Sequence, residues 1–85
     1  MRHGDFSGED VYKAMVNSNV GWYLARTTGD HLILKWEPPE DHNSDARTVS
    51  IPLHNSLDEG TLRGIAKDAG ADDVDEFKDW IESNF

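Results

Sequence analysis

Cysteine is absent from all 85 residues, which excludes disulfides and thiolate metal sites. Long apolar runs are missing as well, and no stretch approaches the roughly 20 apolar residues that a membrane span needs. No apolar segment follows residues 1–5, so we expect no signal peptide. These absences favour a cytoplasmic protein with no membrane association.

Basic residues are scarce, because 8 Lys and Arg stand against 17 Asp and Glu and give a formal net charge of −9. The excess is concentrated in residues 58–85, which hold 9 of the acidic residues and only 3 of the basic ones. Such a chain repels nucleic acid at ordinary ionic strength. Two interpretations follow. One is an acidic module that binds protein. The other is an origin in a salt-rich, halophilic cytoplasm, where a Debye length of about 3 Å leaves only contact charges effective.

Familiar catalytic motifs are also missing, since the chain has no Gly-rich phosphate loop and no His-Glu-x-x-His pair. His3 stands near the N-terminus and His42 in a polar loop beside Asp41, where solvated side chains are a better interpretation than metal ligands. We therefore expect no metal and no small-molecule cofactor. The length predicts a single domain, residues 1–85, with a thin core and no deep substrate cavity.

The first helix has a clear start signal. Ser7 is a good N-cap, and Asp10 three residues later makes a carboxylate variant of the capping box. Phe6 and Val11 occupy the two positions of a hydrophobic staple around that cap. The pattern predicts a helix that begins after Ser7 and ends near residues 17–19.

Three strands and two more helices follow. Residues 21–26 and 31–36 are apolar and aromatic and predict a hairpin around the turn 27–30, and residues 47–51 predict a third strand. Asp58 or a near neighbour is the N-cap candidate of the second helix, and Asp72 or Asp73 is that of the third. The order α-β-β-β-α-α predicts an α+β fold, a three-stranded antiparallel sheet with helices on one face.

His31 is the first residue of the second strand, directly after the turn. Alternation places His31, Ile33 and Lys35 on one face and Leu32 and its alternate neighbours on the other, and both faces hold apolar residues. The pattern therefore does not decide which face the helices cover. An imidazole titrates at about pH 6.5, so His31 could exchange a proton with a ribose 2′-OH. It could equally be a structural histidine held by the turn backbone.

The run GWYLARTTGDH at residues 21–31 indicates a resemblance to a known family. It resembles the core of HicA-type toxins, the YcfA-like RNA interferases, whose pattern is G-W/F-x-x-x-R-x-x-G-S-H. The segments VSIPLH at 49–54 and GTLRGIAKDAG at 60–70 resemble the patterns V-x-V-P-x-H and G-T-L-R-x-I-x-K-x-A-G, and residues 11–16 fit the first helix. The resemblance covers about residues 6–77, with the four fragments in the right order and spacing.

This resemblance implies a fold similar to the double-stranded-RNA-binding domain. It also implies an endoribonuclease, an mRNA interferase of a type II toxin–antitoxin system, that cleaves RNA without metal. His31 matches the catalytic histidine of the family. The implied partners are RNA and a HicB-type antitoxin protein.

Other residues could complete such a site. His54 is an accessory acid or a phosphate contact, or else caps the connector before the second helix. Trp22, Tyr23 and Trp36 could stack on bases, although such aromatics are more often core or sheet residues. Basic side chains position nucleic acid through its phosphates. The candidate phosphate contacts are Arg26, Lys35, Arg47, Arg63 and Lys67.

Two departures from the family favour rival hypotheses. Asp30 stands where the family usually has serine or another small residue, and its carboxylate favours a charged imidazole at His31 and adds negative charge near a bound phosphate. The overall acidity is the second departure. The alternatives are a non-catalytic RNA- or protein-binding module on the same fold, and an acidic protein-interaction domain unrelated to RNA.

Overall fold

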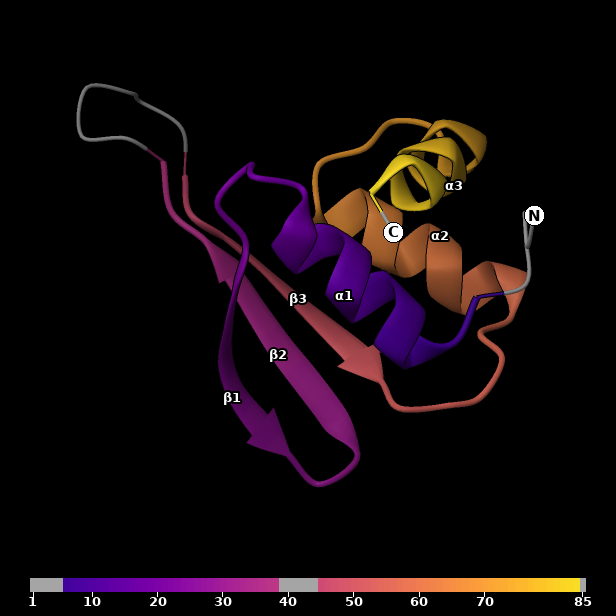
Figure 1. Ribbon diagram of the computed structural model, residues 1–85, viewed down its shortest axis with the longest axis horizontal. Helices are drawn as coiled ribbons and strands as arrows, with labels where there is room; N and C mark the ends of the chain where they lie inside the picture. Colours follow the sequence, from indigo (N-terminus) through magenta and orange to yellow (C-terminus); the bar gives the residue numbers. More distant parts are fainter. Residues whose placement is uncertain (1–5, 39–44, 85) are drawn as a thin grey trace.

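The computed structural model describes residues 6–38 and 45–84, and its order of helices and strands confirms the predicted α-β-β-β-α-α arrangement (Figure 1). His3, and the pair His42 and Asp41 weighed above as metal ligands, lie outside these residues. The elements are α1 (Gly8–Asn17), β1 (Tyr23–Thr28), β2 (His31–Trp36), β3 (Arg47–Pro52), α2 (Glu59–Asp68) and α3 (Val74–Ser83).

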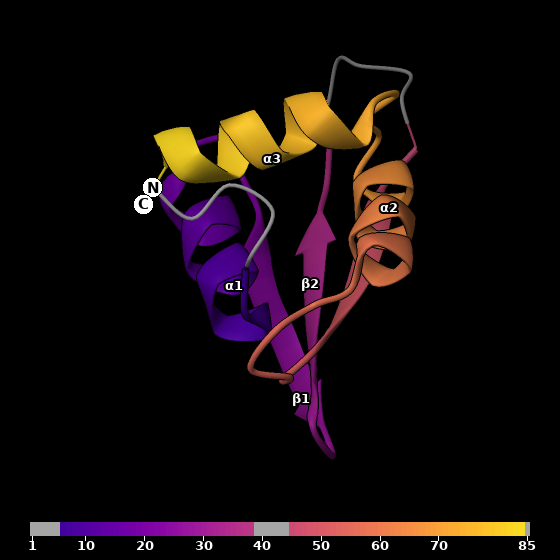
Figure 2. The same cartoon turned by 90° about the vertical axis from the view of Figure 1, so that its right-hand side faces the viewer.

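The three strands form one antiparallel sheet in the order β1-β2-β3, so that β2 is central. All three helices lie on one side of it (Figure 2). The α1 and α2 helices contact the sheet, and α3 packs across both of them. The predicted α+β class is therefore confirmed.

β1 begins two residues later than the sequence predicts. Gly21 has a φ of 117°, which breaks the strand geometry, and Trp22 is buried in the core. The indole N–H of Trp36 donates to the carbonyl of Val20 at 3.0 Å and fixes this entry segment. The strand then runs to Thr28, which shortens the predicted four-residue turn to Gly29 and Asp30.

The buried residues show which face of the sheet the helices cover, a point that the sequence did not settle. Leu32 and Leu34 of β2 are buried on the helix side together with Val49 and Ile51 of β3. His31, Ile33 and Lys35 therefore point away from the helices. The helices and loops supply the rest of the core, namely Phe6, Val11, Ala14, Met15, Trp22, Leu57, Leu62, Ile65, Ala66, Phe77 and Ile81.

Ser7 and Asp58 are confirmed as N-caps, and of the two candidates for α3 it is Asp73 that caps the helix. The Ser7 hydroxyl accepts from the Asp10 amide while the Asp10 carboxylate accepts from the Ser7 amide, both at 3.0 Å, which completes the capping box. The Asp73 carboxylate accepts from the amides of Asp75 and Glu76. Asp58 caps α2 by accepting from the Thr61 amide at 2.7 Å.

The hydrogen bond of the Asp58 cap makes the free energy of unfolding depend on pH in the acid range. Hydrogen bonding from Thr61 holds the pKa of Asp58 below its ordinary value of 3.8. Its contribution is therefore fully present above that ordinary value and is lost as pH falls through the lowered folded value. We expect Asp58→Asn to flatten the fall in the free energy of unfolding below about pH 4, measured by urea unfolding at several pH values.

Asp45→Asn is the matched control, because Asp45 is an exposed carboxylate outside the helices. It should leave the acid dependence as in wild type. Equal slopes for Asp58→Asn and wild type would contradict this account of the cap.

Within the part of the chain that is described, no helix is long and apolar enough to cross a membrane.

Candidate nucleic-acid interface

The sheet face turned away from the helices carries no carboxylate on its strands, although the chain as a whole has a net charge of −9. Two cations and one imidazole lie there among small polar, aromatic and apolar residues. Asp30 and Glu37 stand just outside the strands, one at each end of β2. The strand residues of this open face are Tyr23, Arg26, Thr28, His31, Ile33, Lys35, Thr48, Ser50 and Pro52.

A β-bulge at Ala25 determines which residues of β1 reach the open face. Tyr23 pairs with Lys35 and Arg26 pairs with Ile33, so the register shifts by one residue between them. Strict alternation would put Tyr23 and Arg26 on opposite faces. Because the bulge takes up the extra residue, both side chains lie on the same face as His31.

The backbone holds His31 firmly at the end of the hairpin. His31 pairs with Thr28 on one side and with Pro52 on the other. Gly29 has a φ of 57°, the sign that a type II′ hairpin turn needs at its first central residue. The Leu53 amide also donates to the Asp30 carbonyl at 2.7 Å, which ties the turn to the end of β3.

The His31 side chain is accessible and already has one partner. Its side chain is 45% exposed, and Nδ1 lies 3.0 Å from Oδ1 of Asp30. An ionised carboxylate only accepts hydrogen bonds, so Nδ1 is the donor in this pair. Nε2 of the neutral ring therefore has a free lone pair, as a general base requires. Asp30 thus orients the imidazole as well as adding negative charge beside it.

His54 lies just beyond β3, two residues after the partner of His31. Its carbonyl accepts from the Gly8 amide at 3.0 Å, so the segment is fixed against the start of α1. Its imidazole is exposed, and its positive charge when protonated contributes to lowering the pKa of Asp58. His54 therefore stands at the His31 end of the sheet but also beside the cap of α2.

The five basic residues proposed as phosphate contacts do not form one group. Arg26 and Lys35 share the open face with His31. Arg47 pairs with Trp36, and its guanidinium packs against Gly70 on the helix side. Arg63 and Lys67 are exposed on α2, in the helix layer, and Arg63 pairs with Glu59 at 3.4 Å.

The aromatic residues also separate. Trp22 is buried, and Trp36 packs against the core. Tyr23 is 42% exposed on the open face, cross-strand from Lys35. Partial burial, together with the Glu37 carboxylate that accepts its hydrogen bond, raises the pKa of Tyr23 and keeps its phenol protonated. The sequence did not show that Tyr23 shares a face with Arg26 and His31, because the bulge at Ala25 has no evident mark in the sequence.

These features define an α+β protein with an accessible histidine on a sheet face whose strands carry no carboxylate. Across residues 6–38 and 45–84, no three His, Asp or Glu side chains come together in a way that could hold a metal ion. A family model described as "HicA toxin of bacterial toxin-antitoxin" matches residues 8–71. The chain therefore belongs to the HicA toxin family, as the sequence motifs predict, and is a toxin of the toxin–antitoxin class.

Membership of this family implies an antitoxin partner and an RNA substrate. No curated protein and no solved structure matches the chain. The predicted likeness to the double-stranded-RNA-binding domain therefore stays a prediction.

Proposed function

We propose that this chain is an endoribonuclease of the mRNA interferase type that binds RNA on the open face and cleaves it beside His31. The observation that supports this most is the charge of that face: its strands carry Arg26, Lys35 and His31 and no carboxylate, in a chain with 17 acidic residues. Phosphate groups bind most favourably to cations that have few carboxylates nearby, because carboxylates repel the phosphate. The carboxylates of Asp30, beside His31, and Glu37, beside Tyr23, border this face at its two ends, so RNA meets the least repulsion over its middle, around Arg26.

The proposed chemistry uses the nucleophile that RNA itself carries. Nε2 of His31 takes the proton of a ribose 2′-OH, O2′ attacks the adjacent phosphorus, and the bond from phosphorus to O5′ breaks. The products are a 2′,3′-cyclic phosphate and a 5′-OH, and the leaving oxygen needs one proton. His54 is the candidate donor, because it lies at the same end of the sheet. No metal or other cofactor enters this scheme.

The proposed partner is a HicB-type antitoxin that covers the open face in the cytoplasm and so blocks access to His31. We take residues 1–85 as a single domain that performs this function. A short neighbouring reading frame that encodes a HicB-like protein would support this pairing.

Salt should affect this enzyme differently from a basic nuclease. The Debye length falls from about 10 Å at 0.1 M salt to about 3 Å at 1 M, so molar salt screens distant carboxylates more than contact cations. We expect labelled RNA to be cleaved in EDTA, with cyclic phosphate ends, and the rate to persist or rise between these salt concentrations.

Three other outcomes of this experiment would contradict the proposed function or favour one of its alternatives. A requirement for divalent metal would contradict the proposed chemistry. RNA that is retained on a filter but never cut would support the non-catalytic module instead, and no RNA binding at any salt concentration would favour a protein-interaction domain.

A further inference from the structure

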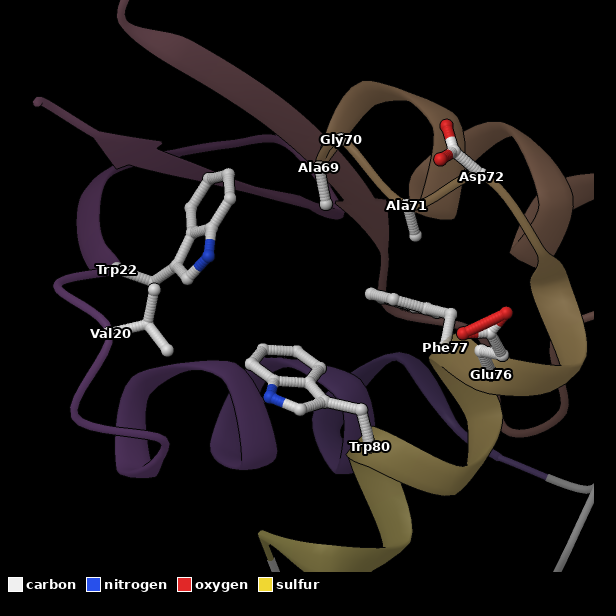
Figure 3. Close-up of a pocket in the computed structure, with 9 residues that line it drawn as sticks. All are labelled: Val20, Trp22, Ala69, Gly70, Ala71, Asp72, Glu76, Phe77 and Trp80. Atoms are coloured by element: carbon white, nitrogen blue, oxygen red, sulfur yellow. The ribbon is translucent and has the colours of Figure 1, made fainter. Parts of the chain in front are cut away.

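A cavity of about 330 Å³ opens on the helix side of the sheet, away from the proposed RNA face. It lies between the segment that enters β1, the turn after α2 and one side of α3 (Figure 3). Its volume is at the lower end of the range of ligand pockets. The cavity can therefore accept one large side chain or a small organic group.

Aromatic rings form the walls of this cavity. Trp22 and Trp80 stand on two sides of it, and Phe77 points in from α3 (Figure 3). The rings of Phe77 and Trp80 are 5.7 Å apart between centroids, so they form one continuous surface. Such faces bind aliphatic chains, and they attract a cation placed above the ring.

Two hydrogen-bond donors in these walls have no partner among the described residues. Trp36 donates its indole N–H to the Val20 carbonyl, whereas the indole groups of Trp22 and Trp80 donate to no atom of residues 6–38 and 45–84. Indole N–H groups usually find an acceptor, and although Trp22 as a residue is only 6% exposed, its nitrogen is not among the fully buried unpaired atoms and so opens into the cavity. A carbonyl oxygen from a partner would satisfy this donor.

Two carboxylates complete the rim. Asp72 and Glu76 line the cavity, and neither side chain has a hydrogen bond or ion pair with any described residue. Residues 70–85 contain six acidic residues and a single basic one, Lys78. Lys78 is buried and bonded to Glu59 at 2.6 Å, so it does not neutralise this rim. Arg47 packs against Gly70 without lining the cavity.

We propose that this cavity is a docking site for an arginine or lysine side chain on a segment of a protein partner. The aliphatic stem would pack on Trp22, Trp80 and Phe77, the cationic group would meet Asp72 and Glu76, and backbone carbonyls of the segment would accept from the indoles. A basic side chain is the one protein group that combines an apolar stem with a cationic head.

The site is independent of the open face. Val20 and Trp22 lie near the Trp36 end of β2, whereas His31 is at the other end, and a six-residue strand spans about 17 Å. The cavity is also on the opposite side of the sheet from His31. One partner could therefore occupy the cavity while the open face holds RNA.

The test is a titration of the folded chain with a blocked alanine–arginine–alanine tripeptide, followed through the indole N–H signals in an NMR spectrum. We expect saturable shifts at Trp22 and Trp80, with a dissociation constant in the millimolar range. The same tripeptide with citrulline keeps the shape but loses the charge, and it should bind about tenfold more weakly.

Asp72→Asn combined with Glu76→Gln should weaken binding of the arginine peptide by a similar factor, because both side chains are on the surface and the fold is kept. Glu9→Gln is the matched control, since it removes one exposed carboxylate from α1, outside the cavity. Equal binding of the citrulline peptide, an equal effect of Glu9→Gln, or no saturable shift of either indole would overturn the proposal. None of these outcomes depends on RNA cleavage, so the proposed function is tested separately.

Discussion

Replacing His31 by alanine should lower the rate of RNA cleavage by about 10²- to 10⁴-fold, the range typical of a general acid or base. The side chain is half exposed, and Asp30 is its one hydrogen-bond partner among residues 6–38 and 45–84, so the fold should survive. Single-turnover cleavage in EDTA measures the rate, and thermal unfolding checks the fold. Cleavage that persists at the wild-type rate in His31→Ala would place the chemistry elsewhere.

Two lysine variants test which face of the molecule binds RNA, measured by retention of labelled RNA on a filter. Lys35→Ala removes a cation from the open face, and Lys67→Ala removes the same charge from α2 on the helix side. We expect the first to weaken RNA binding several-fold and the second to change it less than about twofold. The reverse order would show that RNA binds the helix side.

Replacing Gly8 by alanine should destabilise the protein by about 3 kcal/mol or more, a large part of the 5–15 kcal/mol typical of small domains. A Cβ at this position would lie 2.0 Å from the backbone oxygen of Pro52, so either α1 or the end of β3 must move. The same movement would strain the hydrogen bond from the Gly8 amide to the His54 carbonyl. Because Pro52 pairs with His31, cleavage should fall with stability.

Gly64→Ala is the matched control for Gly8→Ala. A Cβ on Gly64 meets nothing within 4 Å, and the residue is exposed in the middle of α2. Alanine is favoured over glycine in a helix by about 1 kcal/mol, so this variant should be more stable than wild type. Urea unfolding measures both variants. A Gly8→Ala protein as stable as wild type would contradict the close packing of α1 on β3.

Local signals in the sequence were enough to predict the order of the elements and the starts of the helices, of β2 and of β3, although not the start of β1. Ser7, Asp58 and Asp73 each cap a helix through a bond to an amide two or three residues away, and such short-range chemistry is visible in the sequence. The placement of His31 as the first residue of β2 follows in the same way, because glycine and a polar residue precede an apolar run.

Long-range packing explains what the sequence did not predict. β2 carries apolar residues on both faces, so only the packing of α1 and α2 shows that Leu32 and Leu34 face inward. The same packing places Arg47, Arg63 and Lys67 away from His31. The sequence alone does not distinguish these three basic residues from Arg26 and Lys35. The roles of His31, His54, Arg26 and Lys35 in binding and cleavage stay predictions.

The bulge at Ala25 has a consequence for how relatives of this chain could diverge. Loss of the extra residue, Ala25, would restore strict alternation with Tyr23 and Arg26 still on the open face, and the pairing of His31 with Thr28 would stay in place. A single-codon deletion there would straighten β1 without changing which side chains face RNA. Relatives of different length in this edge strand can therefore present the same surface and the same reaction centre.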